Sequence, residues 1–366
     1  MSEFVVGNEI VIPPSAWIKL NSEKTKDEII ELISNLIDDY DLPMPMRKIT
    51  YAEAVADFNA LKEQCSTDLI STGEFYSRYE YEYGYVNKYI EVSSVGMKSS
   101  DYFHQHSRYL CDSINSPSPY RCWTIKKFRQ SMLGALWSLK FKEVNNNVLR
   151  SCLALRKYIA SQFRPSAAKA VYEYFGAEHV LDISAGWGDR LAGFHAASCT
   201  KSYFGIDPNG RLFDGYSDQV LMYQTGKQSM IAQECAESFD FTQINANTYD
   251  MLFTSPPYFI VERYTSETNQ SWQRYKKLEN WLELFLFTTL RNATPTLKSG
   301  AYLAINISDV YCNHTINKIC DPMNNEIAKL GYEYIGGMGL RFPKRPNSKA
   351  SGTGIFCEPI WIWRKL

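Results

Sequence analysis

The chain has no long run of apolar residues. Its most apolar stretch, Trp281 to Leu290, is ten residues long and contains Glu283, whereas a membrane-spanning helix needs about 20 apolar residues. The first residues also lack a basic segment followed by an apolar one, so we expect no signal peptide. These two absences predict a protein that has no membrane partner and works in the cytoplasm.

Patterns that bind metals or form disulfides are missing too. The nine cysteines are scattered, none forms a Cys-x-x-Cys pair, and their odd number argues against a disulfide framework. Histidine occurs only five times, and the two-residue spacing of His104 and His106 does not by itself make a metal site. We expect reduced thiols, as in a cytosol-like compartment, and no bound metal.

The chain also lacks an excess of one charge. Its formal net charge is −1, so a nucleic-acid partner would need a local basic patch. With 366 residues, of which 45% are hydrophobic, the chain is long enough for one large domain and a smaller one. The 25 tyrosines suit either a stacking surface or an ordinary core, and we favour the core.

Two segments of the N-terminal region differ in charge. Ser22 to Asp41 is acidic, shows the helical spacing of apolar residues and begins at a potential N-cap. Arg121 to Arg164 holds ten Lys or Arg residues, among them Lys126, Lys127 and Arg129, and a single acid. The acidic segment favours a solvated helix face. The basic one indicates either a nucleic-acid surface or a charge asymmetry that the acidic helix balances.

From about residue 170 the pattern changes to alternating strands and helices, which predicts a mostly parallel sheet covered on both faces. The last two predicted strands have only a loop between them, so they can pair as an antiparallel hairpin. The predicted strands are 179–184, 202–207, 228–234, 249–255, 301–308, 332–338 and 358–364. The predicted helices between them are 189–197, 209–225, 280–294 and 312–330.

A turn containing glycine follows the first of these strands. In Asp182 to Arg190 an apolar strand leads into Gly186 and Gly188, and a helix then begins. Glycine permits left-handed backbone angles and lets a ligand approach the main chain closely. Dinucleotide enzymes share this turn, although their full Gly-x-Gly-x-x-Gly is absent because residue 191 is Leu. Trp187 within the turn suits a core position as well as a cofactor contact.

An acid stands at the end of the second predicted strand. Asp207 can accept hydrogen bonds from two ribose hydroxyls, as acids do at this position in dinucleotide-binding sheets. The alternative is a helix N-cap, because the next predicted helix begins two residues after Asp207.

The fourth predicted strand ends in Ser255, Pro256, Pro257 and Tyr258. Two prolines cannot continue an interior strand, so the chain must leave the sheet at its carboxyl edge, where ligands bind in open α/β sheets. The rigid turn leaves its carbonyls available as acceptors, and Tyr258 offers a flat aromatic face. Such a loop suits the binding of a planar amine.

Together these motifs resemble the S-adenosylmethionine-dependent amino-methyltransferases of nucleic acids, which methylate exocyclic amines of cytosine or adenine and carry a D/N/S-P-P-Y signature. The resemblance covers roughly residues 160–366 and extends to phage and giant-virus members, which would place the protein in a host-cell cytoplasm. It implies an α/β fold with a Rossmann-like class I methyltransferase sheet, mostly parallel with an antiparallel C-terminal hairpin. A largely helical N-terminal region precedes this sheet.

The resemblance also assigns roles to residues. Ser255, Pro256, Pro257 and Tyr258 correspond to the catalytic loop of the family. The positions that correspond to its S-adenosylmethionine site are Phe163, Asp182, Ser184, Ala185, Gly186, Gly188, Asp207, Pro208 and Glu237.

A mechanism follows from these roles. The Ser255 side chain and the Pro256 carbonyl would accept hydrogen bonds from the amine, which frees its lone pair for attack on the methyl group in one displacement. The base would leave its stack and rest against Tyr258. In the family that the chain resembles, adenine enzymes more often have Asp or Asn at the first loop position, so the resemblance favours cytosine N4 in DNA over adenine N6 for Ser255.

No room follows the catalytic loop for a target-recognition domain. We therefore expect residues 1–160 to contribute nucleic-acid recognition, through Lys126, Lys127 and Arg129, and residues 161–366 to form the methyltransferase domain. Two alternatives stay open: methylation of RNA or of a protein glutamine amide, and a non-catalytic nucleic-acid-binding subunit with the same fold.

Overall fold

Two compact units make up the chain. The computed structural model describes residues 2–156, 159–342 and 354–366. The first unit comprises Met1–Lys48, His106–Ser161 and Arg263–Thr265, and the second comprises Ile49–Gln105, Gln162–Glu262 and Ser266–Leu366.

The second unit is built on a ten-stranded sheet in which seven neighbouring strands follow the order β9, β8, β7, β10, β12, β16, β15. The strands β7 to β10 and β12 are parallel where they pair, and β16 is antiparallel to both β12 and β15. This order, with one antiparallel strand, is that of the Rossmann-like class I methyltransferase sheet, so the predicted fold class is confirmed. The seven strands are His179–Asp182 (β7), Ser202–Ile206 (β8), Gln228–Ala232 (β9), Tyr249–Thr254 (β10), Leu297–Asn306 (β12), Tyr332–Arg341 (β15) and Ile355–Lys365 (β16).

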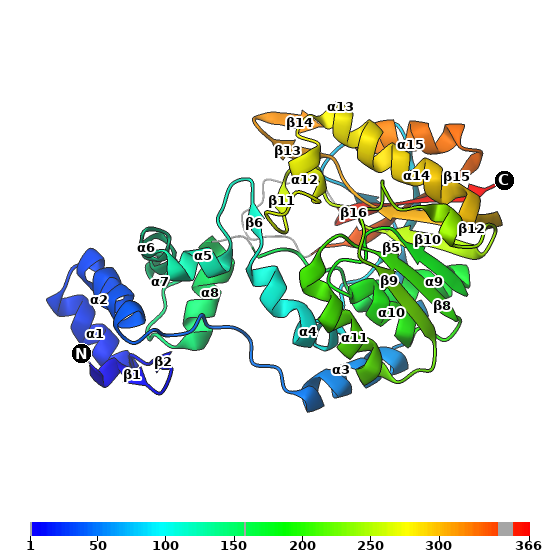
Figure 1. Ribbon diagram of the computed structural model, residues 1–366. Coiled ribbons are helices and arrows are strands. Elements are labelled where there is room, and N and C mark those ends of the chain that lie inside the picture. Colours follow the sequence, from blue (N-terminus) through cyan, green and yellow to red (C-terminus); the bar gives the residue numbers. More distant parts are fainter. Residues whose placement is uncertain (1, 157–158, 343–353) are drawn as a thin grey trace. The chain divides into compact units, whose positions relative to one another are not determined.

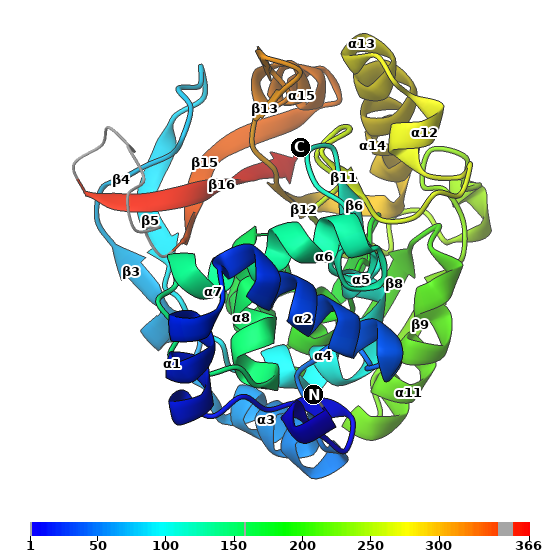
Figure 2. The same ribbon diagram turned by 90° about the vertical axis from the view of Figure 1, so that its left-hand side faces the viewer.

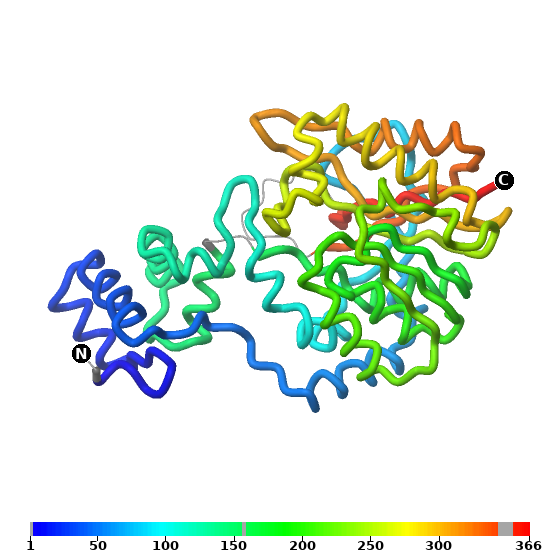
Figure 3. The backbone as a smooth tube through the Cα atoms, viewed as in Figure 1, coloured from blue at the N-terminus to red at the C-terminus, as the bar shows by residue number. Residues whose placement is uncertain are grey.

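The central strands are apolar because both faces of the sheet are covered. Val180 and Leu181 in β7, like Met251 and Phe253 in β10, are essentially inaccessible to solvent. Side chains alternate between the two faces of a strand, so burial of successive residues requires helices on both sides. Figure 3 follows the same backbone as a smooth tube from the N-terminus to the C-terminus. Figure 1 shows α9 (Pro165–Phe175), α10 (Asp189–Ala196) and α11 (Phe213–Tyr223) on one face and α14 (Thr288–Ala293) and α15 (Cys320–Lys329) on the other.

Residues from the N-terminal region extend this sheet. The strand β5 (Tyr85–Ile90) runs parallel to β15 and pairs with β3 (Ile70–Thr72), and β4 (Phe75–Tyr76) pairs with β16 (Figure 2). The helix α3 (Tyr51–Glu63) packs on α10 and α11, with Phe58 stacked on Tyr223 at 3.8 Å between ring centroids.

These contacts divide the chain differently from the expected boundary between residues 160 and 161. One crossing between the units does lie there, after Ser161, but residues 49–105 belong with the sheet. The strands β3 and β4 are only three and two residues long. Segments this short carry too little periodicity to be read from the sequence.

The predicted helix 312–330 is correct only in its second half, which is α15. The preceding residues form a hairpin of β13 (Val310–Cys312) and β14 (Thr315–Asn317), whose turn residues Asn313 and His314 have φ values of 51° and 61°. Asparagine and histidine are enriched among non-glycine residues with positive φ, so an Asn-His pair was the signal for this turn.

The helix predicted from Ser22 begins later. Ser22 lies in α1 (Pro14–Glu23), and α2 spans Lys26–Asp39 with Thr25 as its N-cap. The Thr25 hydroxyl accepts from the Glu28 backbone N–H while the Glu28 carboxylate accepts from the Thr25 backbone N–H. This capping box outweighs the isolated Ser22 signal because it satisfies two backbone donors at once.

The first unit is helical around its own core, which contains Trp17, Ile33, Leu136 and Leu149. No helix among the described residues has both the length and the hydropathy of a membrane span. Besides α1 and α2 the unit contains α5 (Pro119–Thr124), α6 (Lys126–Leu133), α7 (Ala135–Ser138), α8 (Asn146–Arg156) and a hairpin of β1 (Val5–Val6) and β2 (Glu9–Ile10).

Candidate active site

The glycine turn lies at the carboxyl end of β7 and leads into α10. Gly186 and Gly188 both have left-handed backbones, with φ of 61° and 69°. A Cβ on Gly188 would stand 2.1 Å from Gln219 Oε1, so a side chain there would also displace the Gln219 amide of α11. The Ala185 N–H donates to the Ile206 carbonyl at 3.0 Å, which ties the turn to β8.

Asp182 is the anchor of this turn. It is fully buried and receives hydrogen bonds from the Arg190 guanidinium (2.7 and 3.3 Å), the Tyr203 hydroxyl (2.8 Å), the Thr254 hydroxyl (2.9 Å) and the Ser184 N–H (3.1 Å). A carboxylate offers about four acceptor positions. In this geometry Asp182 therefore has no acceptor position left for a cofactor and holds the turn instead.

Asp207 keeps acceptor capacity at the edge of the sheet. Its Oδ2 accepts from the Gly186 N–H at 2.8 Å and its Oδ1 from the Asn209 N–H at 2.9 Å, so each oxygen has a further position to accept a hydrogen bond. Burial raises the pKa of Asp207 to about 6, and it is 8% exposed. The N-cap of the following short helix, Gly210–Leu212 (η3), is Asn209, so the alternative role of Asp207 as that cap is wrong.

Further predicted cofactor residues line the same edge. The Pro208 carbonyl accepts from the Asn269 amide at 2.9 Å. Glu237 follows β9 and binds Arg274 at 2.6 Å and the Tyr275 hydroxyl at 3.2 Å. Burial raises the pKa of Glu237.

Phe163 and Ser184 adjoin the buried anchor. The Arg190 guanidinium lies over the Phe163 ring, 5.6 Å from its centroid, and Phe163 packs edge-on against Phe253 of β10. The Arg190 side chain also donates to the Ser184 carbonyl. Trp187 is 8% exposed, which agrees with the core alternative.

The catalytic-loop candidates follow β10 directly. Pro256 is buried, Ser255 and Tyr258 are half-buried, and the next residue, Phe259, has a φ of 54°. The parallel strands β7 and β10 are neighbours, so this loop and the glycine turn emerge at the same carboxyl edge. The structure thus brings the predicted catalytic and cofactor residues of residues 163–258 to one edge of one sheet.

Two residues of this edge were missed by sequence reasoning. Asn306, the last residue of β12, lies 3.4 Å from the Ser255 hydroxyl through its Oδ1 and 3.4 Å from Glu358 Oε2 through its Nδ2. Glu358 lies in β16, and burial raises its pKa to about 7. Neither residue belongs to a motif, and the neighbours of each within its strand are mostly apolar.

A comparison with known families agrees with this arrangement. Residues 249–364 match the DNA methylase family model. The matched segment covers about a third of the chain and contains the Ser255–Tyr258 loop, β12 and the β15–β16 hairpin, but not the glycine turn. The predicted resemblance to nucleic-acid amino-methyltransferases is therefore confirmed for this segment. The match does not test the phage and giant-virus resemblance, which stays a prediction.

Several solved structures with similarity to the chain are described as methyltransferases or methylases. A putative S-adenosylmethionine-dependent methyltransferase from Listeria monocytogenes shares 12% identity over 55% of this chain and 99% of its own, with a TM-score of 0.35. The N-methyltransferase NodS from Bradyrhizobium japonicum shares 12% identity over 52% of this chain and 86% of its own, with a TM-score of 0.33. An rRNA methylase from Streptococcus thermophilus shares 12% identity over 57% of this chain and 99% of its own, with a TM-score of 0.35. No curated protein matches the chain.

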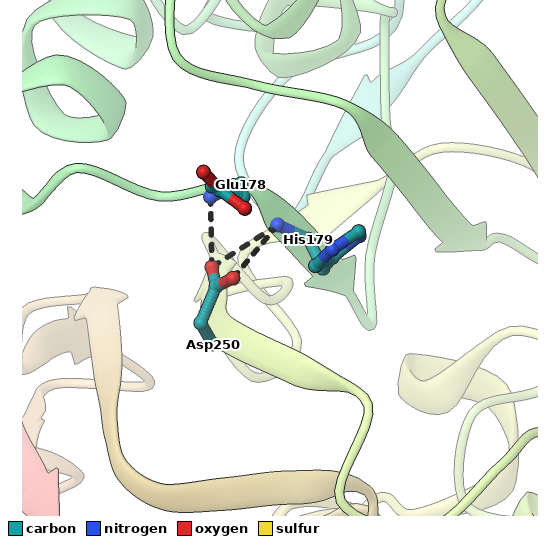
Figure 4. Close-up of side chains that lie close together, drawn as sticks. All are labelled: Glu178, His179 and Asp250. Atoms are coloured by element: carbon teal, nitrogen blue, oxygen red, sulfur yellow. Dashed lines mark hydrogen bonds between the residues drawn. The ribbon is translucent and has the colours of Figure 1, made fainter.

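The opposite edge of the sheet carries the one group among the described residues with the spacing of metal ligands, namely Glu178, His179 and Asp250 (Figure 4). The Asp250 carboxylate accepts from the backbone N–H groups of Glu178 and His179 at 2.9 and 3.1 Å. Glu178 pairs with Lys201 at 2.7 Å, and His179 Nδ1 lies 2.7 Å from the Ser202 hydroxyl. These bonds fix the start of β7 and give each group a structural role.

The three predicted nucleic-acid-binding residues differ in solvent exposure. Arg129 is 1% exposed and bound by the Ser34 hydroxyl, the Trp123 carbonyl and Asp38, so its assignment to a nucleic-acid surface is wrong. Lys126 is exposed but pairs with Glu31 at 2.5 Å. Lys127 is exposed. The acidic helix α2 thus neutralises part of the basic segment, as the charge-asymmetry alternative expected.

Cofactor affinity is expected to depend on pH through Asp207. Only the carboxylate makes charge-assisted hydrogen bonds, so affinity for S-adenosylmethionine should fall by up to about tenfold per unit below pH 6. Asp207→Asn should bind at least about tenfold more weakly at pH 8 and lose this dependence. Calorimetry from pH 5 to pH 8 measures both effects, and an unchanged affinity in the folded variant would contradict the ribose assignment.

Proposed function

We propose that the chain is an S-adenosylmethionine-dependent methyltransferase that methylates an exocyclic amine of a nucleobase, namely cytosine N4 in DNA. One observation carries the proposal: the Ser255–Tyr258 loop leaves the sheet at the edge where the glycine turn and Asp207 lie. The DNA methylase match to residues 249–364 supports it.

The residues present fit the cofactor. Asp207 retains two acceptor positions, which suits the two hydroxyls of a ribose. Gly186 has a left-handed backbone, and a Cβ there would make only an ordinary contact, 3.7 Å from the Ser184 carbonyl oxygen. When bound, S-adenosylmethionine supplies an activated methyl group. Asp182 and Arg190 keep the turn rigid. Asp207, Pro208 and Glu237 lie along the carboxyl edge of the sheet.

The catalytic loop orients the amine. Its two N–H groups donate to the Ser255 hydroxyl oxygen and the Pro256 carbonyl, which draws the nitrogen out of conjugation with the ring. The lone pair would then be free to attack the methyl group that bound S-adenosylmethionine supplies, and the methylated ammonium would lose its proton to water. Positioning and preorganised acceptors supply the rate enhancement.

The decisive experiment is methyl transfer from tritiated S-adenosylmethionine to DNA, RNA and protein, followed by mass spectrometry of the nucleosides. We expect N4-methylcytosine from DNA. If N6-methyladenine were the only modified nucleoside found, the base assignment would be contradicted but the mechanism would stand. Label in protein, or no modified nucleoside, would contradict the proposal.

Exposed lysines of the first unit are the revised candidates for DNA contact. The unit holds 16 Lys or Arg against 11 Asp or Glu, whereas the second holds 23 against 29. Replacing Lys127, Lys140 and Lys142 by Gln should weaken DNA binding and flatten its salt dependence by about 0.9 log units per lost phosphate contact.

The control for this prediction neutralises three exposed lysines from the other part of the same unit, Lys19, Lys24 and Lys48. Titration of labelled duplex DNA at several salt concentrations measures both slopes. Equal slopes for the two triple variants would show that Lys127, Lys140 and Lys142 form no specific surface.

A further inference from the structure

The amide orientation of Asn306 is fixed by its neighbours. One end of the amide lies 3.0 Å from the Pro359 carbonyl oxygen and 3.4 Å from Glu358 Oε2. A carbonyl and a carboxylate only accept hydrogen bonds, so this end must be the NH2 group. The amide oxygen of Asn306, which is 3% exposed, therefore points to the Ser255 hydroxyl.

This orientation determines what Ser255 can do. A hydroxyl has one proton, and Asn306 Oδ1 takes it because an amide oxygen cannot donate. The Tyr258 hydroxyl is also hydrogen-bonded to Ser255. At least one lone pair of the Ser255 oxygen is then left as an acceptor, which is the polarity that binding of an amine N–H requires. If the amide were reversed, its NH2 group would donate to Ser255 and occupy one of these lone pairs.

The same two residues hold Tyr258. Its hydroxyl lies 3.5 Å from the Asn306 main-chain carbonyl oxygen and is also hydrogen-bonded to the Glu358 carboxyl group, so its one proton is shared between these two acceptors. Burial, and then the charge of Glu358, raise the pKa of Tyr258, so this hydroxyl stays protonated and acts as a donor. The ring that is to stack on the target base is thereby anchored at its far end.

We propose that Asn306 and Glu358 are positioning residues for methyl transfer, which fix the Ser255 hydroxyl as an acceptor and hold the ring of Tyr258. This inference rests on the proposed function. Neither residue touches the reacting atoms, and both act through the catalytic loop.

The charges around Glu358 make the role measurable. Burial raises the pKa of Glu358 to about 7, and the nearby Glu262 carboxylate raises it further. Hydrogen bonds from Tyr258 and Asn306, and the charge of Arg164, act in the opposite direction. On the neighbouring strand β15, Arg341 is paired with Glu91 at 2.5 Å. Protonated Glu358 is no longer an obligate acceptor, so turnover should fall as the pH drops through about 7.

The kinetic test compares kcat between pH 5.5 and 9 at saturating S-adenosylmethionine, with tritiated methyl transfer to unmethylated plasmid DNA as the assay. Glu358→Gln should lower kcat about tenfold at pH 8, leave the KM for S-adenosylmethionine unchanged and abolish the acidic limb. Glu262→Gln removes a charge that raises the Glu358 pKa, so it should move the acidic limb to lower pH. It tests the same role even if Glu358→Gln does not fold.

A second readout does not depend on activity. In protein labelled with 15N-asparagine, the side-chain amide signal of Asn306, assigned by its loss in Asn306→Ser, should titrate near pH 7 and stop titrating in Glu358→Gln. An active wild type together with an unchanged kcat and pH profile in Glu358→Gln would overturn the positioning role alone. A wild type that transfers no methyl group to DNA, while the Asn306 signal still titrates, would instead overturn the proposed function.

Discussion

Asp182→Ala is expected to lower the free energy of unfolding by about 3–5 kcal/mol, because it leaves the Arg190 guanidinium buried without its counter-charge. The side chain of Arg190 is 5% exposed and that of Asp182 is fully buried. The substitution also removes the acceptor of the Tyr203 and Thr254 hydroxyls, which donate to the same carboxylate. Urea denaturation followed by circular dichroism measures the loss.

Two further variants separate this role from a direct cofactor contact. Asp218→Ala removes an exposed acid from α11 and should leave stability within about 0.5 kcal/mol of the wild type. Asp182→Leu combined with Arg190→Met removes both charges and should cost less than Asp182→Ala alone. Wild-type stability of Asp182→Ala, with only its cofactor affinity reduced, would show that Asp182 serves the ligand and not the turn.

The sheet could be predicted from the sequence because its central strands are buried on both faces. Continuous apolar residues such as those around Val180 and Met251 carry that information locally, and turns with Gly or Pro mark their ends. The predicted order of the glycine turn, Asp207 and the Ser255–Tyr258 loop then placed all three at the carboxyl edge, and the structure agrees. Local pattern and topology thus sufficed for the position of the candidate site.

The contact partners and burial of individual side chains could not be predicted in the same way. Arg129 belongs to a basic helix, and its burial depends on Ser34 and Asp38, which lie 95 and 91 residues away. The partner of Ser255, Asn306, is 51 residues away on a strand that reads as core. Such pairs depend on which strands and helices become neighbours, and no local periodicity encodes that.

Ser255→Ala should lower kcat by about a hundredfold or more, the cost typical of removing one preorganised polar group that acts on the transition state. The hydrogen bond from the amine to the Ser255 oxygen strengthens as the nitrogen pyramidalises and acquires positive charge, so its loss affects turnover more than binding. Affinity for S-adenosylmethionine should be unchanged, because the Ser255 hydroxyl is bonded to Asn306 and Tyr258, whereas the proposed ribose acceptor is Asp207.

Ser255→Thr is the matched variant, since it keeps a hydroxyl at the same position and should retain most of the activity if the added methyl group fits. Single-turnover methyl transfer with saturating enzyme measures the chemical step without product release. If Ser255→Ala raised only the KM for DNA and left kcat intact, the hydroxyl would bind the base equally in ground and transition states. The Asn306–Glu358 pair would then have no acceptor to orient, and the loop would act through the Pro256 carbonyl and the Tyr258 ring.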